Sequence, residues 1–143
     1  MGVFLTFSIW VHALDRDSTL KIYQDIFTSL SAKQVVSVYT LDSEYQSVFK
    51  QATQLHVVHS PEISDIILIT NISGLETLKT LPKGEKSPIV FVTEYPLLEK
   101  SEKIVGAIYW RKGRSQLLFL KNRLEKNNIT LPQKYHKFIV EKP

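Results

Sequence analysis

The chain has 143 residues, of which 43% are hydrophobic and 22% are charged. This is the composition of one ordinary globular domain, and it excludes a wholly disordered, fibrous or polytopic membrane protein. Because the chain contains no cysteine, disulfide bonds, zinc–thiolate sites, iron–sulfur clusters and a cysteine nucleophile are excluded as well. The net charge of +4 is uneven, since residues 1–75 carry −3 and residues 76–143 carry +7. The basic half favours an acidic partner, an anionic membrane surface or nucleic acid, and it is equally typical of a solvated basic face.

The chain opens with an apolar segment, Met1 to Ala13, that turns polar at Asp15-Arg16-Asp17. The segment is shorter than the roughly 20 residues of a transmembrane helix, but it has the length of the apolar region of a secretory signal. Val11-His12-Ala13 has the small-residue pattern of a cleavage site, although no Lys or Arg precedes the apolar run. We therefore expect residues 1–13 to be a signal peptide and residues 14–143 to be a single exported domain. The alternative is a first buried strand.

Helical and β-type hydrophobic patterns alternate along the next part of the chain. The continuously apolar run 65–70 is typical of a strand buried on both faces, so we expect it to be central, with Ile67 and Ile69 buried. This alternation favours a mainly parallel sheet with helices on both faces. In chain order the predicted elements are a helix over 18–32, a strand over 35–40, a helix over 45–52, strands over 55–58 and 65–70, a short helix over 73–81 capped by Ser73, and a strand over 88–93.

The C-terminal part follows a different pattern. Apolar runs over 104–110 and 116–120 flank Arg111-Lys112-Gly113-Arg114, a short glycine-containing connection that predicts an antiparallel β-hairpin. Asn122 is positioned to cap a final helix over 123–127, and Tyr135, Phe138 and Ile139 can pack a last turn or tail. The expected fold is therefore α/β, with a mainly parallel sheet and a C-terminal antiparallel hairpin.

Two groups of residues are candidates for binding. The ends of parallel strands meet at one edge of a sheet, where such folds hold ligands. We therefore consider Asn71, Ser73, Thr93 and Glu94 as candidate ligand-binding residues, together with Thr40, Asp42, Ser43 and Thr70. The same residue types are also favoured in loops and helix caps. The second group, Arg111, Lys112 and Arg114, lies beside Tyr109 and Trp110 and is a candidate partner-binding site; the alternative is a solvated hairpin tip with inward-facing aromatic rings.

Catalytic and metal-binding motifs have little support in this sequence. No G-x-S-x-G elbow or glycine-rich phosphate loop is found, and Asn71 stands near the position where a receiver domain needs an aspartate. His56 and His59 are three residues apart, so on one strand they would point to opposite faces. No recognised nucleic-acid-binding motif occurs. We expect a protein that is not an enzyme and that uses no metal and no cofactor.

Several stretches resemble the YfiR/HmsC family of small periplasmic proteins. They are Asp65-Ile-Ile-Leu-Ile-Thr, Pro88-Ile-Val-Phe-Val-Thr-Glu-Tyr-Pro96, Ile104-Val-Gly-Ala-Ile, Lys112-Gly-Arg, Leu118-Phe-Leu-Lys-Asn122 and Asn128-Ile-Thr-Leu131. The resemblance covers roughly residues 18–140, and its most specific portion is the hairpin, the asparagine that opens the next helix and the apolar tail. The chain departs from the family in having Val105-Gly106 where a Gly-Gly pair is common, and in lacking cysteine.

The resemblance implies an exported, non-enzymatic α/β regulator. Such proteins bind and repress the periplasmic part of an inner-membrane diguanylate cyclase, which links envelope signals to cyclic di-GMP and biofilm formation. It also implies a helix-capping role for Asn122. A second copy of the chain is a further candidate partner. The alternative function is that of a periplasmic small-ligand-binding domain of a transport or sensory system, using the cleft at the strand ends.

Overall fold

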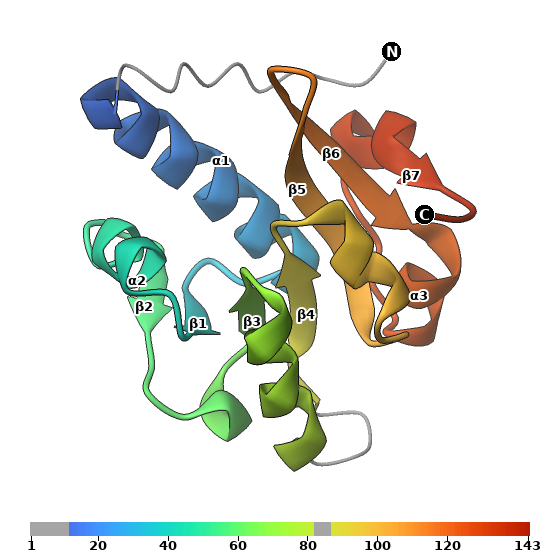
Figure 1. Cartoon of the computed structure of the whole chain (residues 1–143), viewed down its shortest axis with the longest axis horizontal. Helices are drawn as coiled ribbons and strands as arrows, with labels where there is room; N and C mark the ends of the chain where they lie inside the picture. Colours follow the sequence, from blue (N-terminus) through green and yellow to red (C-terminus); the bar gives the residue numbers. More distant parts are fainter. Residues whose placement is uncertain (1–11, 82–86) are drawn as a thin grey trace.

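The structure is a computed structural model that describes residues 12–81 and 87–143, with side chains from Arg16 onward. Residues 82–86, which follow the predicted helix over 73–81, and residues 1–11 of the predicted signal peptide lie outside the described residues. In the described part, seven strands form one sheet in the order β2-β1-β3-β4-β5-β6-β7 (Figure 1). In chain order they are β1 (Val36–Thr40), β2 (Leu55–Val57), β3 (Ile66–Ile69), β4 (Ile89–Val92), β5 (Ile104–Arg111), β6 (Arg114–Leu120) and β7 (Ile139–Val140).

The strand directions confirm the predicted fold class. Strands β2, β1, β3, β4 and β5 are mutually parallel, and β5 turns back into the antiparallel β6. The C-terminal β7 then pairs parallel to β6. Strand β3 lies inside the sheet between β1 and β4, and Ile67 and Ile69 are only 1% and 2% exposed. The predicted burial of these two residues is confirmed. Both faces of β3 are covered, so all four of its side chains are buried.

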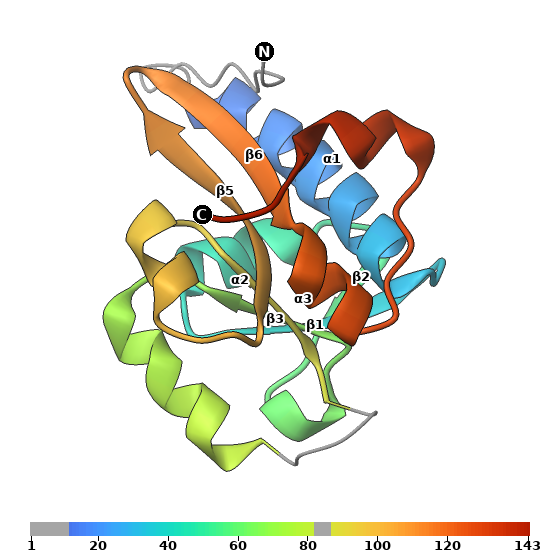
Figure 2. The ribbon, with the colours of Figure 1, turned by 90° about the vertical axis from the view of Figure 1, so that its right-hand side faces the viewer.

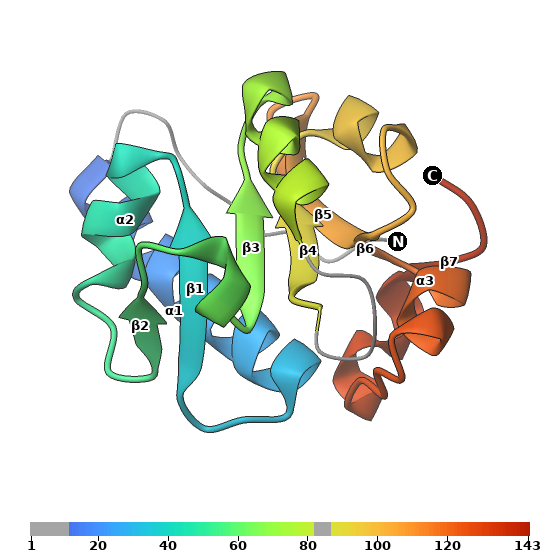
Figure 3. The ribbon, with the colours of Figure 1, turned by 90° about the horizontal axis from the view of Figure 1, so that it is seen from below.

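Helices cover both faces of the sheet, as predicted (Figure 3). One face packs against α1 (His12–Ser31), α2 (Ser43–Phe49), α3 (Lys121–Lys126) and the 3₁₀ helix η4 (Gln133–Phe138). The other face packs against the 3₁₀ helices η2 (Ile72–Thr80) and η3 (Tyr95–Glu99). A further 3₁₀ turn, η1 (Pro61–Ile63), leads into β3. The tail residues Tyr135 and Phe138 are buried on the α1 face.

Side-chain alternation along β3 divides the core in two. Ile66 and Leu68 point to the α1 face, whereas Ile67 and Ile69 point to the η2 face, as the two-residue period of a strand requires. The α1 core contains an aromatic cluster in which the Tyr23 ring meets those of Phe27, Phe49 and Phe91 edge to face, with centroids 5.4 to 6.4 Å apart. Edge-to-face contacts of this kind add to the burial of apolar area, so α1 is firmly attached to the sheet.

Two predicted helix caps are wrong. Helix η2 is capped by Asn71, not by Ser73, because Asn71 has the extended backbone that precedes the first turn and its side chain accepts a hydrogen bond from the Gly74 amide at 3.2 Å. Helix α3 starts at Lys121, directly after β6, so Leu120 occupies the cap position and makes no side-chain cap. Asn122 therefore lies within the first turn of α3, and the capping role implied by the family resemblance is not found.

Helix α1 is longer than predicted at its start. It begins at His12, so the last two residues of the predicted signal peptide are the first two residues of this helix. The prediction that the chain is cleaved and exported stays a prediction.

Candidate functional site

The first candidate site lies at the carboxyl ends of β1 and β3. The chain passes from β1 outward to β2 and then returns to β3 on the other side of β1, so the strand order reverses between β1 and β3. Open α/β sheets bind ligands at this position. The structure has a hollow of about 160 Å³ there. Four of the eight candidate ligand-binding residues line it: Asp42, Thr70, Asn71 and Ser73.

Two further candidate ligand-binding residues belong to the next strand. Thr93 and Glu94 follow β4 and do not line this hollow. The Thr93 hydroxyl donates a long hydrogen bond, 3.5 Å, to the carbonyl oxygen of Thr70, and Glu94 is exposed at the start of η3 without capping it. Thr93 and Glu94 therefore share one edge of the sheet with Asn71 and Ser73 but do not belong to the same site.

Three polar side chains that line the hollow, those of Asp42, Asn71 and Ser73, are already engaged in local structure. The Asn71 Oδ1 atom accepts hydrogen bonds from the Ser73 hydroxyl at 2.5 Å and from the Gly74 amide. The Asp42 carboxylate accepts from the amides of Glu44 and Tyr45, at 2.9 and 3.1 Å, and so caps α2. Pockets for small molecules usually measure about 300 to 1,000 Å³. This hollow is smaller, and Asp42 and Asn71 are committed to helix caps, so the structural interpretation of these residues is favoured.

The second candidate site is the tip of the β5–β6 hairpin. Strand β4 ends at Val92, opposite Ala107, so β5 continues from Ile108 to Arg111 beyond the edge of its parallel neighbour. Figures 1 and 2 show both hairpin strands reaching past the rest of the sheet. The two turn residues, Lys112 and Gly113, both have positive φ, 51° and 77°. This is the type I′ geometry that matches the twist of paired strands.

The hairpin brings the predicted partner-binding residues together at its exposed end. Arg111 pairs directly with Arg114 across the two strands, and both residues and Lys112 are exposed. Within the described part of the chain, Arg111 and Lys112 form no ion pair with an acidic residue. The tip is therefore a compact cationic surface on a two-stranded support.

The aromatic residues beside the turn take opposite environments. The Tyr109 ring faces η3, and its centroid lies 5.0 Å from that of the Tyr95 ring. Trp110, in contrast, is 44% exposed. The expectation of inward-facing aromatic rings is correct for Tyr109 and wrong for Trp110. Adjacent strand residues point to opposite faces of the sheet, so Trp110 points away from η3. Trp110 also lies beyond the end of β4, where this face of the hairpin is only partly covered.

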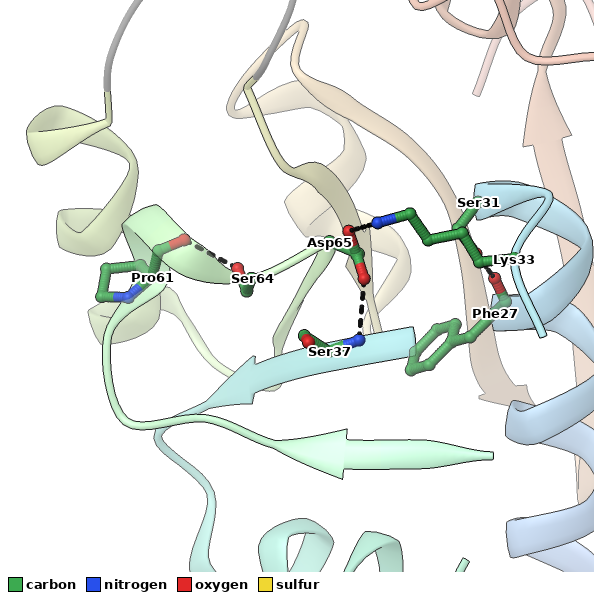
Figure 4. Close-up of polar contacts among 7 residues, drawn as sticks. All are labelled: Phe27, Ser31, Lys33, Ser37, Pro61, Ser64 and Asp65. Atoms are coloured by element: carbon green, nitrogen blue, oxygen red, sulfur yellow. Dashed lines mark hydrogen bonds and ion pairs between the residues drawn. The ribbon is translucent and has the colours of Figure 1, made fainter. Parts of the chain in front are cut away.

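The largest hollow described here was not anticipated from the sequence. It lies at the opposite edge of the sheet, measures about 590 Å³, and is lined by residues that include Lys33, Asp65 and Lys126. Figure 4 shows that the Asp65 carboxylate joins two segments, since one oxygen lies 2.7 Å from Lys33 Nζ and the other accepts from the Ser37 amide at 2.9 Å. Its contacts connect the loop after α1 and the start of β1 to β3.

Two serines at this hollow are engaged in the same way. The Ser31 hydroxyl donates to the carbonyl oxygen of Phe27 at 2.8 Å, and the Ser64 hydroxyl donates to that of Pro61 at 2.7 Å. These contacts, like those of Asp65, hold the chain in place at the amino ends of the strands. No local sequence signal links Lys33 to Asp65, since 32 residues separate them.

Arg123 is another residue that sequence patterns did not reveal. Its Nη1 atom donates to the carbonyl oxygens of Leu98, Ser101 and Ile104, at 2.7, 3.0 and 2.9 Å. Burial lowers the pKa of the guanidinium from its ordinary value, and the Glu102 carboxylate opposes this shift. Arg123 thus fixes the loop between η3 and β5 by donating to three backbone carbonyl groups at once.

Comparison with known proteins gives no family assignment, since no family model, curated protein or solved structure matches this chain. Among the residues that the structure describes, no three His, Asp or Glu side chains form a group that could hold a metal ion. Over the same residues, none of the helices combines the length and the apolar character needed to cross a membrane. The most distinctive exposed feature on which a function can be based is the hairpin tip.

Proposed function

We propose that this protein is a non-enzymatic regulatory domain that binds another protein through the tip of its β5–β6 hairpin. The observation that carries the proposal is the exposure of Trp110 beside Arg111 and Lys112 at the end of a projecting, type I′ hairpin. Trp and Arg are the residues most often found at the energetic centres of protein interfaces. A paired hairpin also loses little conformational freedom on binding, which supports a contact made without folding of a loop.

The cellular setting of the proposal comes from the sequence. The apolar segment at residues 1–13 supports export to the periplasm, and the resemblance to the YfiR/HmsC family supports an inner-membrane partner. We propose that the partner is the periplasmic part of a signalling protein such as a diguanylate cyclase, and that binding represses it. No cofactor is required for this role.

The proposal is tested in a deletion strain. Loss of the protein should raise cyclic di-GMP, and a plasmid copy of the natural chain should restore the lower level. A copy carrying Arg111→Glu, Lys112→Glu and Arg114→Glu should fail to restore it and should bind the partner more weakly. The reason is that three attractive charges at the contact become repulsive. The binding that remains should also depend less on salt, because exposed charge attraction is screened.

Controls separate loss of contact from loss of folding. The double variant Arg111→Glu/Lys112→Glu leaves Arg114 in place and should also fail to restore the lower level. Circular dichroism and thermal midpoints check that each variant is folded. The matched triple variant Lys21→Glu/Lys50→Glu/Lys142→Glu makes the same change of charge at exposed lysines away from the hairpin, and it should restore the lower level. Unchanged cyclic di-GMP in the deletion strain, in ordinary growth and under envelope stress, would reject the regulatory role.

A small-ligand-binding domain is the second candidate function. It is favoured by one observation, the hollow at the carboxyl ends of β1 and β3, where the strand order reverses. Under this alternative, mutations at Asn71 and Ser73 would alter function while the hairpin variants would not. The hairpin tip has the stronger case, because the Asn71 oxygen is already occupied as a helix cap, whereas Arg111 and Lys112 form no ion pair with another described residue.

A further inference from the structure

A groove runs along η2 on the face of the sheet that also carries η3. It has a volume of about 440 Å³ and lies between η2 and the loop that follows η3. Three apolar residues of η2 and three lysines line it: Ile72, Leu75, Leu78, Lys79, Lys100 and Lys103. The groove is separate from the hairpin tip, although η2, η3 and the hairpin lie along the same side of the domain (Figure 2).

The apolar residues form a continuous stripe. A 3₁₀ helix has three residues per turn, so Ile72, Leu75 and Leu78 lie one above another along η2. Ile72 is 65% exposed, Leu75 is half-buried, and Leu78 is buried against the sheet. The stripe therefore descends from an exposed end into the floor of the groove, and part of its apolar surface remains in contact with water.

The rim of the groove carries unbalanced positive charge. Lys79 Nζ lies 3.1 Å from the carboxylate of Glu76, which also lines the groove. Across the part of the chain that the structure describes, Lys100 and Lys103 are in no ion pair. The neighbouring Glu102 lines a different hollow together with Arg123.

We propose that this groove binds an acidic amphipathic segment of a protein partner. Apolar side chains of the segment would cover Ile72 and Leu75, and its carboxylates would face Lys100 and Lys103, in the helix-in-groove mode of recognition. The inference rests on the proposed function, because it names the chemistry of the partner's contact surface. A small molecule is disfavoured because small-ligand pockets bury most of their ligand, whereas the exposed Ile72 marks a shallow groove. A membrane anchor is disfavoured because Leu75 and Leu78 lie on the floor instead of protruding.

The test uses a synthetic probe and the full chain. The probe is a fluorescein-labelled peptide of about twelve residues, with leucines at helical spacing and glutamates at the positions that flank this apolar stripe. Saturable binding should raise the fluorescence anisotropy and shift the backbone amide resonances of Leu75, Lys100 and Lys103 in NMR spectra. The same peptide with lysines in place of glutamates, and a second with serines in place of leucines, should bind at least about tenfold more weakly, a difference of about 1.4 kcal/mol.

Variants of the chain test the same groove from the other side. Lys100→Glu/Lys103→Glu should weaken binding of the acidic peptide by about tenfold, because attraction is lost and repulsion is gained. The matched variant Lys21→Glu/Lys50→Glu should change the affinity for the peptide by less than about twofold. Ile72→Ser should weaken binding, and Val35→Ser, at another exposed apolar residue, should not.

Three results would overturn the inference. They are absence of saturable binding, equal binding by the acidic and basic peptides, and resonance shifts confined to another surface. Sedimentation of the protein with anionic phosphatidylglycerol vesicles, without peptide binding, would assign the groove to a lipid surface and would also reject the proposal. The peptide measurement needs no cognate partner and no hairpin residue, so its outcome is distinguishable from that of the cyclic di-GMP experiment.

Discussion

Asp25 connects the beginning and the end of the folded chain. The Tyr135 hydroxyl donates a hydrogen bond to Asp25 Oδ2, and Lys134 Nζ lies 2.7 Å from the same oxygen. Partial burial favours the neutral carboxyl and acts to raise its pKa, but the hydrogen bonds from Lys134 and Tyr135 and the Lys134 charge outweigh this effect, so the pKa of Asp25 is lowered. For Tyr135, burial and the adjacent carboxylate both raise the pKa of the phenol. The pair therefore attaches η4 to α1 most strongly when Asp25 is ionised and Tyr135 is neutral.

This arrangement predicts a pH-dependent contribution to stability. A carboxyl whose pKa is lower in the folded than in the unfolded chain stabilises the fold above its unfolded pKa of about 3.9, and it loses that contribution as pH falls through the lower folded value. Asp25→Asn should reduce the free energy of unfolding at neutral pH by about 1 kcal/mol, a modest value because the side chain is half exposed. Urea titrations of the natural chain and the variant, repeated over a range of pH, give the free energy of unfolding as a function of pH. The two curves should converge below about pH 4. A difference that stayed constant down to pH 2 would contradict the assignment.

Burial of Ile67 and Ile69 leads to a second prediction at the residue scale. Replacing either with Ala removes buried methyl and methylene groups and leaves a cavity, which should cost about 2 to 5 kcal/mol. Denaturant midpoints, with the slope of the transition checked, measure the loss. Ile63→Ala is the matched control, since Ile63 is 68% exposed, and it should change stability by less than about 0.5 kcal/mol. A loss below about 1 kcal/mol at both buried positions would put the role of β3 in doubt.

At the scale of elements, the β5–β6 hairpin combines a packed base with an exposed end. Gly106 is required at the base, because a Cβ atom there would lie 2.5 Å from the Leu118 carbonyl oxygen and 3.1 Å from the Phe91 ring. Ile108 and Leu117 pair across the strands and are buried. The hairpin is therefore fixed where it joins the sheet, and its exposed tip extends from a rigid support.

The turn geometry predicts the effect of changing Lys112. Its φ of 51° is unfavourable for most side chains but is well tolerated by Asn, and Asn-Gly is the preferred pair for a type I′ turn. Lys112→Asn should therefore stabilise the protein by about 0.5 kcal/mol. Lys112→Gln, which removes the same charge without the turn preference, separates relief of repulsion from Arg111 and Arg114 from the backbone effect. Thermal midpoints in which Gln stabilised as much as Asn would show that charge alone is responsible.

At the scale of the whole molecule, the sheet topology turns a gradient along the sequence into one across the domain. Strands β2, β1 and β3 come from the acidic half of the chain, and β4 to β7 come from the basic half. Because the two sets occupy opposite sides of the sheet, the excess of Lys and Arg gathers on the side that holds the hairpin. This separation supports long-range attraction of an acidic partner to that side.

Export of the protein is also a property of the whole molecule. If residues 1–13 are a signal peptide, N-terminal sequencing of the native protein should begin near Leu14, and the protein should be recovered from the periplasmic fraction. The physical reason is that a signal peptidase recognises the small residues at Val11-His12-Ala13 after an apolar run. Recovery of an intact chain starting at Met1 from the cytoplasm would contradict export, and with it the proposed cellular role.

The amino-acid sequence by itself determined the kinds of elements and much of their placement. The β-branched and apolar runs predicted strands β1 to β6, and the glycine between two apolar runs predicted the hairpin. The predicted hairpin also placed Arg111, Lys112 and Arg114 together at one tip, because a hairpin is a local structure whose strand pairing follows from its turn. The sequence did not determine the helix caps, because several polar residues near a helix start can each act as one, as Asn71 and Ser73 show. It also did not determine that α3 begins directly after β6, with Leu120 in the cap position.

The tertiary structure alone decided the strand order, and with it the contacts between distant residues. Asp25 and Tyr135 are 110 residues apart, and Arg123 binds carbonyl groups 19 to 25 residues earlier in the chain. The groove beside η2 joins residues of η2 to residues of the loop after η3, segments that only the folded sheet brings side by side. Periodicity reports which face of an element is buried, but it carries no information about the neighbour that buries it. That choice is made by the packing of all layers together, so these contacts appear only in the folded molecule.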